Sequence, residues 1–66
     1  MDWTDSEDIG IELFESNPGM NPLDVRFTDL HRMVMELEDF QGEADKSSEG
    51  KLEAIQMAWL EEYNDQ

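Results

Sequence analysis

Apolar residues recur every three or four positions in three stretches of this chain, which is the repeat of an amphipathic α-helix. The middle stretch, residues 28–40, follows the repeat most fully, with Leu30, Met33, Val34 and Leu37 at positions i, i+3, i+4 and i+7. Asp29 places an anion in its first turn, where the helix dipole favours negative charge. We therefore predict a helix over residues 28–40.

The first stretch, residues 4–16, has a narrower apolar stripe formed by Ile9, Leu13 and Phe14. It opens with Thr4-Asp5-Ser6-Glu7, which fits a capping box, in which a threonine caps the helix and a glutamate three positions later bonds back. It is followed by Asn17-Pro18-Gly19, a strong helix breaker. We predict a helix that is capped by Thr4 and ends at about Ser16.

The third stretch follows a serine cap and runs to about Tyr63. Its apolar face consists of Leu52, Ile55, Trp59 and Tyr63. Between the helices, Asn21-Pro22 predicts a cap followed by proline at the first helical position, which starts a short turn through Val25. The polar residues 41–49 predict a loop. Since no useful length of chain alternates with the period of two that strands require, the pattern predicts an all-α, compact three-helix domain.

The length of 66 residues is enough for a single domain, residues 1–66. The chain has no cysteine, so disulfides and thiolate metal sites are both excluded. No apolar run approaches the roughly 20 residues that span a bilayer, and the N-terminal residues lack the basic and apolar regions of a secretory signal. We expect a cytoplasmic monomer that does not enter a membrane.

Charge is the strongest signal in the composition. Eighteen acidic residues against four basic ones give a formal net charge of −14. Nucleic-acid binding needs a basic surface, so this charge argues against DNA or RNA as a partner. The natural complements are a basic protein surface or a hard metal cation. An apolar content of 38% and two tryptophans indicate a folded chain in spite of the charge.

Two groups of carboxylates are candidates for binding such a partner. The first group lies on the first predicted helix, within about 80° of arc, and consists of Asp5, Asp8, Glu12 and Glu15. The second lies on the second predicted helix and consists of Asp29, Glu36, Glu38 and Asp39. Like charges three or four positions apart destabilise a helix. Because these carboxylates weaken the helices that carry them, we infer that they bind a cation or a basic partner. The alternative is that both groups are ordinary solvated helix surface.

Catalysis is not indicated. With His31 as the single histidine and no cysteine, the chain cannot assemble a Ser-His-Asp, Cys-His or zinc constellation except in reduced form. A surface hydrogen-bonding role is favoured for His31 over a ligand or proton-transfer role. A three-helix domain of this size also offers little pocket. We predict a binding protein, with no catalytic residue and no organic cofactor.

Aromatic residues and methionines have two possible roles. A partner could be anchored by Trp3, Trp59, Phe27 and Phe40, but a domain of this size needs aromatic residues for its core, and we expect them there. Met35 and Met57 lie off the apolar faces of their helices, so we expect them to be exposed.

Several segments together resemble the IscX (YfhJ) family. They are Trp3-Thr4-Asp5-Ser6, Ile9-Gly10, Val25-Arg26-Phe27-Thr28-Asp29-Leu30-His31, Leu37-Glu38-Asp39-Phe40, Leu52-Glu53-Ala54-Ile55 and Trp59-Leu60. They occur in the family's order over nearly the whole chain, and the string from Val25 to His31 is the most specific of them.

The resemblance implies a helical domain with helix-turn-helix or winged-helix character, encoded with the bacterial iron–sulphur cluster assembly machinery. It implies a small acidic adaptor that binds a basic surface of the cysteine desulfurase IscS, overlapping the bacterial frataxin site. It also implies weak binding of Fe²⁺ through surface carboxylates, and a role in supplying iron or regulating assembly.

These roles are assigned to residues as follows. The candidate iron ligands are Asp5, Asp8, Glu12, Glu15 and Asp29. The candidate partner contacts are Trp3, Asp5, Asp8, Glu12, Arg26, Asp29, His31, Glu36, Glu38 and Asp39. Two other functions remain open: an acidic domain that binds another basic protein or mimics DNA, with no iron role, and a purely structural or cation-buffering domain.

Overall fold

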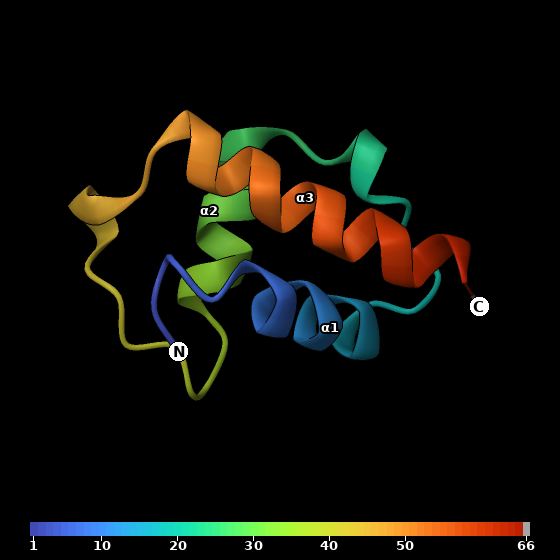
Figure 1. Cartoon of the computed structure of the whole chain (residues 1–66), viewed down its shortest axis with the longest axis horizontal. Coiled ribbons are helices and arrows are strands. Elements are labelled where there is room, and N and C mark those ends of the chain that lie inside the picture. Colours follow the sequence, from blue (N-terminus) through green and yellow to red (C-terminus); the bar gives the residue numbers. More distant parts are fainter. Residues whose placement is uncertain (66) are drawn as a thin grey trace.

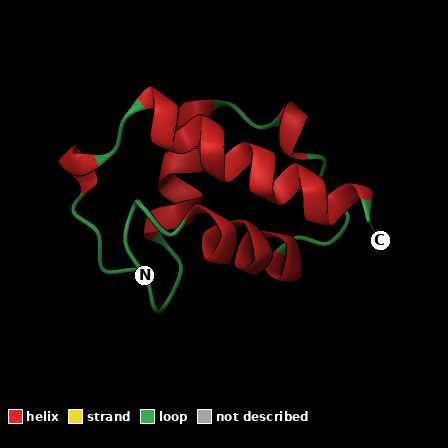
Figure 2. Ribbon diagram, in the orientation of Figure 1, coloured by secondary structure: helices red, strands yellow, loops and turns green. Residues whose placement is uncertain are grey.

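The computed structural model describes residues 1–65, and it is built from three α-helices and two short 3₁₀ helices (Figures 1 and 2). In chain order these are α1 (Ser6–Ser16), η1 (Pro22–Asp24), α2 (Phe27–Met35), η2 (Ala44–Lys46) and α3 (Glu49–Asn64). The prediction of an all-α, three-helix domain is confirmed. Because residues 1–65 contain no strand, the β-hairpin of a winged helix is not seen in them and that part of the expectation is not confirmed.

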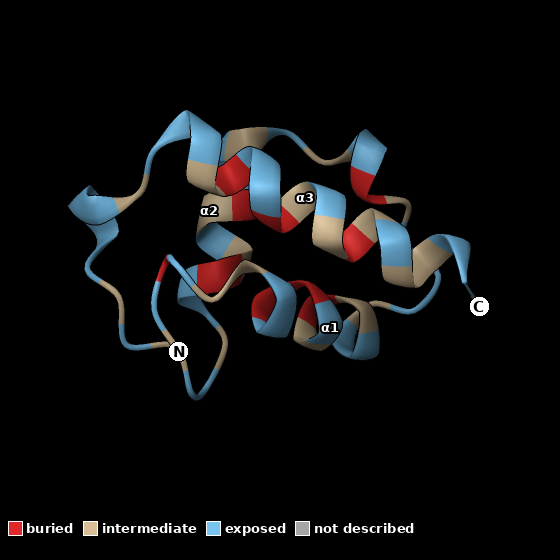
Figure 3. Ribbon diagram, in the orientation of Figure 1, coloured by how far each residue is buried: buried red, intermediate tan, exposed pale blue. Residues whose placement is uncertain are grey.

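The three helices bury one side each. In Figure 1, α1 and α3 lie side by side and run in the same direction, while α2 crosses the ends at which both begin. The buried residues lie on the facing sides of the helices (Figure 3). They form one cluster, which consists of Trp3, Ile9, Leu13, Leu30, Val34, Leu52, Ile55 and Trp59. The predicted apolar stripes thus supply the core, and the prediction that Trp3 and Trp59 belong to it is confirmed.

The exposure of other apolar residues agrees with their positions on the predicted helices. Met35 and Met57 are exposed, as expected. Tyr63, which was placed on the apolar face of the third helix, is half-buried near the end of α3. No helix in the described part of the chain has both the length and the apolar character that crossing a bilayer requires.

Gly10 sets the distance between α1 and α3. A Cβ atom added at this position would stand 2.7 Å from the Cβ atom of Ala58 and 2.7 Å from the backbone nitrogen of Trp59. Real Cβ atoms do not approach other atoms so closely. The two helices therefore touch backbone to backbone at this point, and only glycine on α1 permits it.

The predicted start of the first helix is wrong by one residue. Asp5, and not Thr4, occupies the position that precedes α1, and no side chain caps the helix there. The Thr4 hydroxyl and the Thr4 amide both donate to Asp2 Oδ1, at 2.6 and 2.9 Å. Because Thr4 is engaged with the preceding turn, it is not available to α1. The caps by Asn21 and by a serine, Ser48, are confirmed, since their side chains accept from the amides of Leu23 and Lys51.

The second helix is shorter than predicted. It ends at Met35, and the chain continues in tight turns, in which the amides of Leu37 and Phe40 donate to the carbonyls three positions before them. These turns carry Phe40 onto Trp3, with ring centroids 4.8 Å apart in an edge-to-face arrangement. A continued helix would carry Phe40 away from this contact. The helical spacing of apolar residues continues to Leu37, although the helix itself ends at Met35, and this is why the prediction was too long.

The predicted loop 41–49 contains the unpredicted η2 and is held against the core by Trp3. The indole Nε1 of Trp3 donates to the Glu43 carbonyl at 2.7 Å. His31 Nε2 is 2.8 Å from the Ala44 carbonyl, with which it forms a hydrogen bond. Gly42 lies beneath this contact, where a Cβ atom would stand 2.9 Å from Trp3 Cδ1. The loop is therefore held against the core by these side-chain contacts, together with the backbone hydrogen bond of η2.

The close contact at Gly10 can be tested by Gly10→Ala. The added methyl group overpacks the α1–α3 interface, so we expect a loss of about 1–3 kcal/mol in the free energy of unfolding, measured by urea denaturation. The matched control is Gly50→Ala, where nothing lies within 4 Å. Since alanine is the better helix former, this variant should be neutral or gain up to about 1 kcal/mol. Equal stability of both variants would contradict the close contact.

Candidate functional site

Carboxylates from two distant segments of the chain meet in one open hollow of about 510 Å³, which we call the acidic hollow. It lies between the second half of α1 and the turns that follow α2. Its lining consists of Glu12, Glu15, Ser16, Glu36, Leu37, Glu38 and Asp39. Five of these seven residues are acidic, and they include members of both groups of carboxylates found in the sequence.

The fold places these carboxylates for identifiable reasons. Because α1 turns Ile9 and Leu13 into the core, Glu12 and Glu15 lie toward its other side. The early end of α2 turns residues 36–39 back toward α1. There the Met1 amino group donates to the Asp39 carbonyl at 2.8 Å, and the Gln41 amide donates to the Met1 carbonyl at 2.7 Å. These two bonds hold the end of the turn beside the start of the chain.

Glu12 is the least solvated carboxylate in the hollow. Its Oε2 atom is buried and has no hydrogen-bond partner. Loss of hydration raises the pKa of Glu12 above its ordinary value of 4.5. Side-chain interaction with Asp39, and then the negative charges of Asp39 and Glu15, raise this pKa further, while the positive charge of the Met1 amino group lowers it. Negative charge is therefore concentrated here at a cost to the folded state.

The chain's own cations do little to neutralise the acidic hollow. In the part of the chain that the structure describes, the side-chain ion pairs are those of Arg32, with Glu36 at 3.1 Å and with Asp29 at 4.0 Å. All three side chains are more than half exposed, so the pairs add little stability. Glu12, Glu15, Glu38 and Asp39 have no such partner among residues 1–65.

The other predicted acidic residues lie beside the hollow or away from it. Asp8 lines a smaller hollow that also contains Glu12 and Asp39 and so extends the acidic surface. Asp5 is half-buried, and its Oδ2 accepts from the Asp2 amide at 2.9 Å. Asp29 and Arg26 belong to the other end of α2, where Arg26 is exposed and Asp29 faces Arg32.

The predicted iron ligands do not form a preorganised metal site. Nowhere in residues 1–65 do three histidine, aspartate or glutamate side chains stand close enough together to hold an ion. An ion on this surface would keep most of its coordination positions filled by water. The assignment of Asp5, Asp8, Glu12, Glu15 and Asp29 as iron ligands therefore stays a prediction.

Two predicted partner contacts turn out to organise the core. Trp3 is 3% exposed, so its indole packs inside the protein and is not on the surface that a partner would meet. His31 is half-buried, its ring centroid lies 5.0 Å from that of Trp3, and its Nε2 bonds to a backbone carbonyl. This agrees with the hydrogen-bonding role favoured for His31. Trp3 is therefore not accessible in this structure, and its assignment as a partner contact stays a prediction, like that of His31.

The sequence predicted both groups of acidic residues, but it did not predict that they line one hollow. The predicted helix carried Glu36, Glu38 and Asp39 on one continuous element, whereas all three lie beyond the end of α2 at Met35. Glu36 is the residue that caps α2, and the other two lie in the turns that follow. A useful signal was present in Phe40, whose apolar side chain had to reach the core together with Trp3. The hollow follows once α2 is ended early enough to allow that contact.

Comparison with known proteins places the chain beside an iron–sulphur assembly protein family. A family model described as iron–sulphur cluster assembly matches residues 1–64. An uncharacterized protein of Pseudomonas aeruginosa is 50% identical over 60 residues, which are 91% of this chain and 91% of that protein. The match therefore extends over almost the entire chain.

Replacing Glu12 tests the electrostatic cost of the acidic hollow. Since its pKa is raised on folding, the folded state binds the proton more tightly than the unfolded state. Its contribution to stability thus falls as pH rises through the raised pKa, and is recovered as pH falls toward 4.5. We expect Glu12→Gln to raise the urea midpoint at about pH 7 by more than Glu53→Gln does, and the difference to close near pH 4.

Glu53→Gln is the control because it removes the same charge from an exposed position on α3. Equal midpoints for the two variants at neutral pH would show that Glu12 costs the fold no more than any surface carboxylate. A difference that widened as pH fell would contradict the assigned direction.

Proposed function

We propose that this chain, which belongs to the iron–sulphur cluster assembly family, is a small acidic adaptor that docks on a basic surface of the cysteine desulfurase in that machinery. Membership of the family confirms the resemblance to the IscX family that the sequence showed, and supports a role in iron–sulphur cluster assembly. The proposal is that the chain acts by binding and not by catalysis, and that the acidic hollow is its docking surface.

The observation that carries the proposal is the gathering of unneutralised carboxylates in one hollow. Four acidic side chains that line it have no ion pair within residues 1–65, while the chain as a whole carries a net charge of −14. A basic partner would replace repulsion among these carboxylates by attraction, and would steer its own approach over a Debye length. A catalytic role has less support, because the hollow is lined by carboxylates and the Ser16 hydroxyl, with no histidine beside them to activate that hydroxyl.

The same surface is the proposed place for ferrous iron. Fe²⁺ is here a cargo, held by carboxylate oxygens that suit hard cations. Since residues 1–65 bring no three such ligands together, the ion would be bound weakly and would keep most of its water. Weak binding is compatible with delivery, because an ion that is held loosely can be passed on. The second candidate function, an acidic domain for a different basic protein, uses the same charge but has a different partner and no iron role.

Neutralising the acidic hollow should weaken binding to purified cysteine desulfurase. The test variant removes three exposed charges by Glu15→Gln, Glu38→Gln and Asp39→Asn. The matched control removes three exposed charges from α3 and its end by Glu53→Gln, Glu61→Gln and Asp65→Asn. By calorimetry at low salt we expect the test variant to lose roughly tenfold in affinity and the control much less. The unmodified protein should lose affinity steeply as salt rises.

Equal losses in the two triple variants would show that only total charge matters, and would remove the acidic hollow from the docking surface. No binding of the unmodified protein to the desulfurase at low salt would overturn the choice of partner. If this chain instead captured a purified basic protein other than the desulfurase in a pull-down, the second candidate would be favoured.

Iron binding can be located by anaerobic titration of the isotope-labelled protein with Fe²⁺. We expect the paramagnetic ion to broaden the amide signals of Glu12, Glu15 and Glu38 first, because these residues line the hollow. The triple variant of the acidic hollow should need more iron for the same broadening, and the α3 control variant should not. Broadening that begins around Asp29 would place the ion on the Arg32 side of α2 and contradict the proposal.

A further inference from the structure

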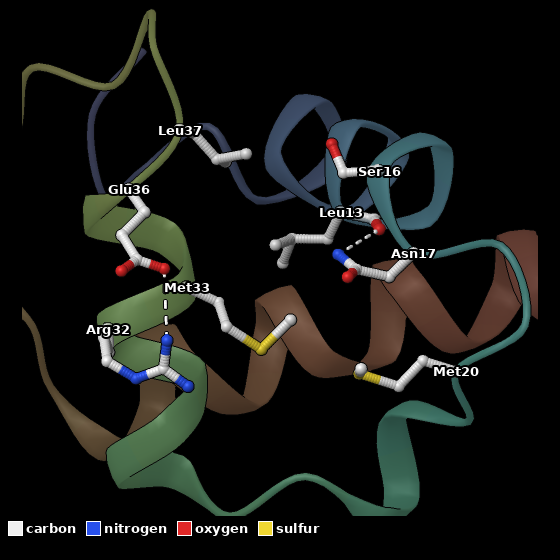
Figure 4. A pocket seen from close by; sticks show the side chains of 8 residues that line it. All are labelled: Leu13, Ser16, Asn17, Met20, Arg32, Met33, Glu36 and Leu37. Carbon is white, nitrogen blue, oxygen red and sulfur yellow. Dashed lines mark hydrogen bonds and ion pairs between the residues drawn. The ribbon is translucent and has the colours of Figure 1, made fainter.

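A second hollow, the apolar groove, lies beside the acidic hollow and has a different chemistry. It is open, has a volume of about 360 Å³, and lies between the end of α1 and α2. Its apolar side chains are Leu13, Met20, Met33 and Leu37. Its polar side chains are Ser16, Asn17, Arg32 and Glu36. Figure 4 shows Met20 and Met33 reaching in from opposite sides, with Leu13 and Leu37 between α1 and the turn that follows α2.

The apolar residues of the groove are not fully used by the core. Leu13 is buried, but Met33 and Leu37 are only half-buried, and Met20 is 40% exposed. A methionine side chain is flexible and polarisable, and adapts its shape to the group placed against it. The groove thus presents an adaptable apolar surface in a chain that is otherwise strongly acidic.

The groove and the acidic hollow form one continuous surface. They share three lining residues, Ser16, Glu36 and Leu37. The single cation of the groove, Arg32, is matched by Glu36 and Asp29, so the groove itself has no excess positive charge. An apolar side chain seated in it therefore has unpaired carboxylates of the acidic hollow as its neighbours.

We propose that the apolar groove seats an aliphatic or aromatic side chain from a basic segment of a protein partner, whose flanking lysine or arginine side chains meet the acidic hollow. This inference rests on the proposed function, because it describes the partner of the same surface. Charge complementarity selects this occupant over a second copy of the chain, since two copies would each bring a charge of −14.

The two contacts would respond differently to salt. Screening weakens the charge contact as ionic strength rises, whereas burial of an apolar side chain does not depend on it in this way. The groove would also select among basic partners. A segment with lysine and arginine alone would bind only through charge, and a segment with an apolar residue in register would bind more tightly.

The test uses two short synthetic peptides of alternating lysine and serine, one of which has leucine at its central position in place of serine. Binding to the full chain is measured by calorimetry at low and high salt. We expect leucine to tighten binding by roughly five- to tenfold, and this ratio to persist at high salt while both affinities fall. Met20→Ser should abolish most of the ratio. The matched control Met57→Ser should keep it, since Met57 is 51% exposed on α3 and lines neither hollow.

The outcomes separate this inference from the function on which it rests. If the serine peptide binds at low salt and leucine adds nothing, or if both methionine variants lose the ratio equally, the groove proposal is overturned and the acidic docking surface stands. If neither peptide binds at low salt while the desulfurase does, a basic segment is excluded as the occupant of the groove and the proposed function stands. Sedimentation of the unbound protein covers the remaining occupant: a dimer that Met20→Ser disrupts would assign the groove to a second copy.

Discussion

The backbone contact between α1 and α3 at Gly10 is the constraint on which the rest of the molecule depends. With a Cβ atom there, the helices would have to separate, because the added atom would stand 2.7 Å from Ala58 and Trp59. Close approach lets Ile9 of α1 and Ile55 of α3 be fully buried in a domain too small for a second core layer. It also fixes the rotation of α1. The side of α1 opposite this contact is therefore the side that carries Glu12 and Glu15.

Trp3 positions the segment between α2 and α3, as Gly10 positions α1 against α3. Its indole ring packs against Phe40 and His31, and its Nε1 donates to the Glu43 carbonyl. One side chain thereby orders the chain that leaves α2 and the loop that leads to α3. Glu38 and Asp39 lie on this ordered chain, so the acidic hollow depends on the buried aromatic ring of Trp3.

How far the sequence predicted the structure depended on whether a feature is local. The periodic Leu30 and Val34 located α2, and the short polar side chains of Asn21 and Ser48 located two caps, because each is decided within one helical turn. The end of α2 was not predictable in this way, since Leu37 continues the helical spacing outside the helix. Its position is decided by contacts with Trp3 and Met1, which are remote in sequence. The acidic hollow and the groove inherit that dependence, so neither could be assembled from the pattern alone.

The acidic hollow joins stability to binding. Poor hydration and neighbouring carboxylates hold the pKa of Glu12 above its ordinary value, so the empty protein is held in an electrostatically unfavourable state. A cation or a basic segment at the hollow would favour the ionised form of Glu12, lower its pKa and release any proton it holds. Because such a ligand binds the folded chain and not the unfolded one, it would also stabilise the fold by mass action. If the chain docks as proposed, the repulsion that weakens the free domain would become part of the driving force for docking.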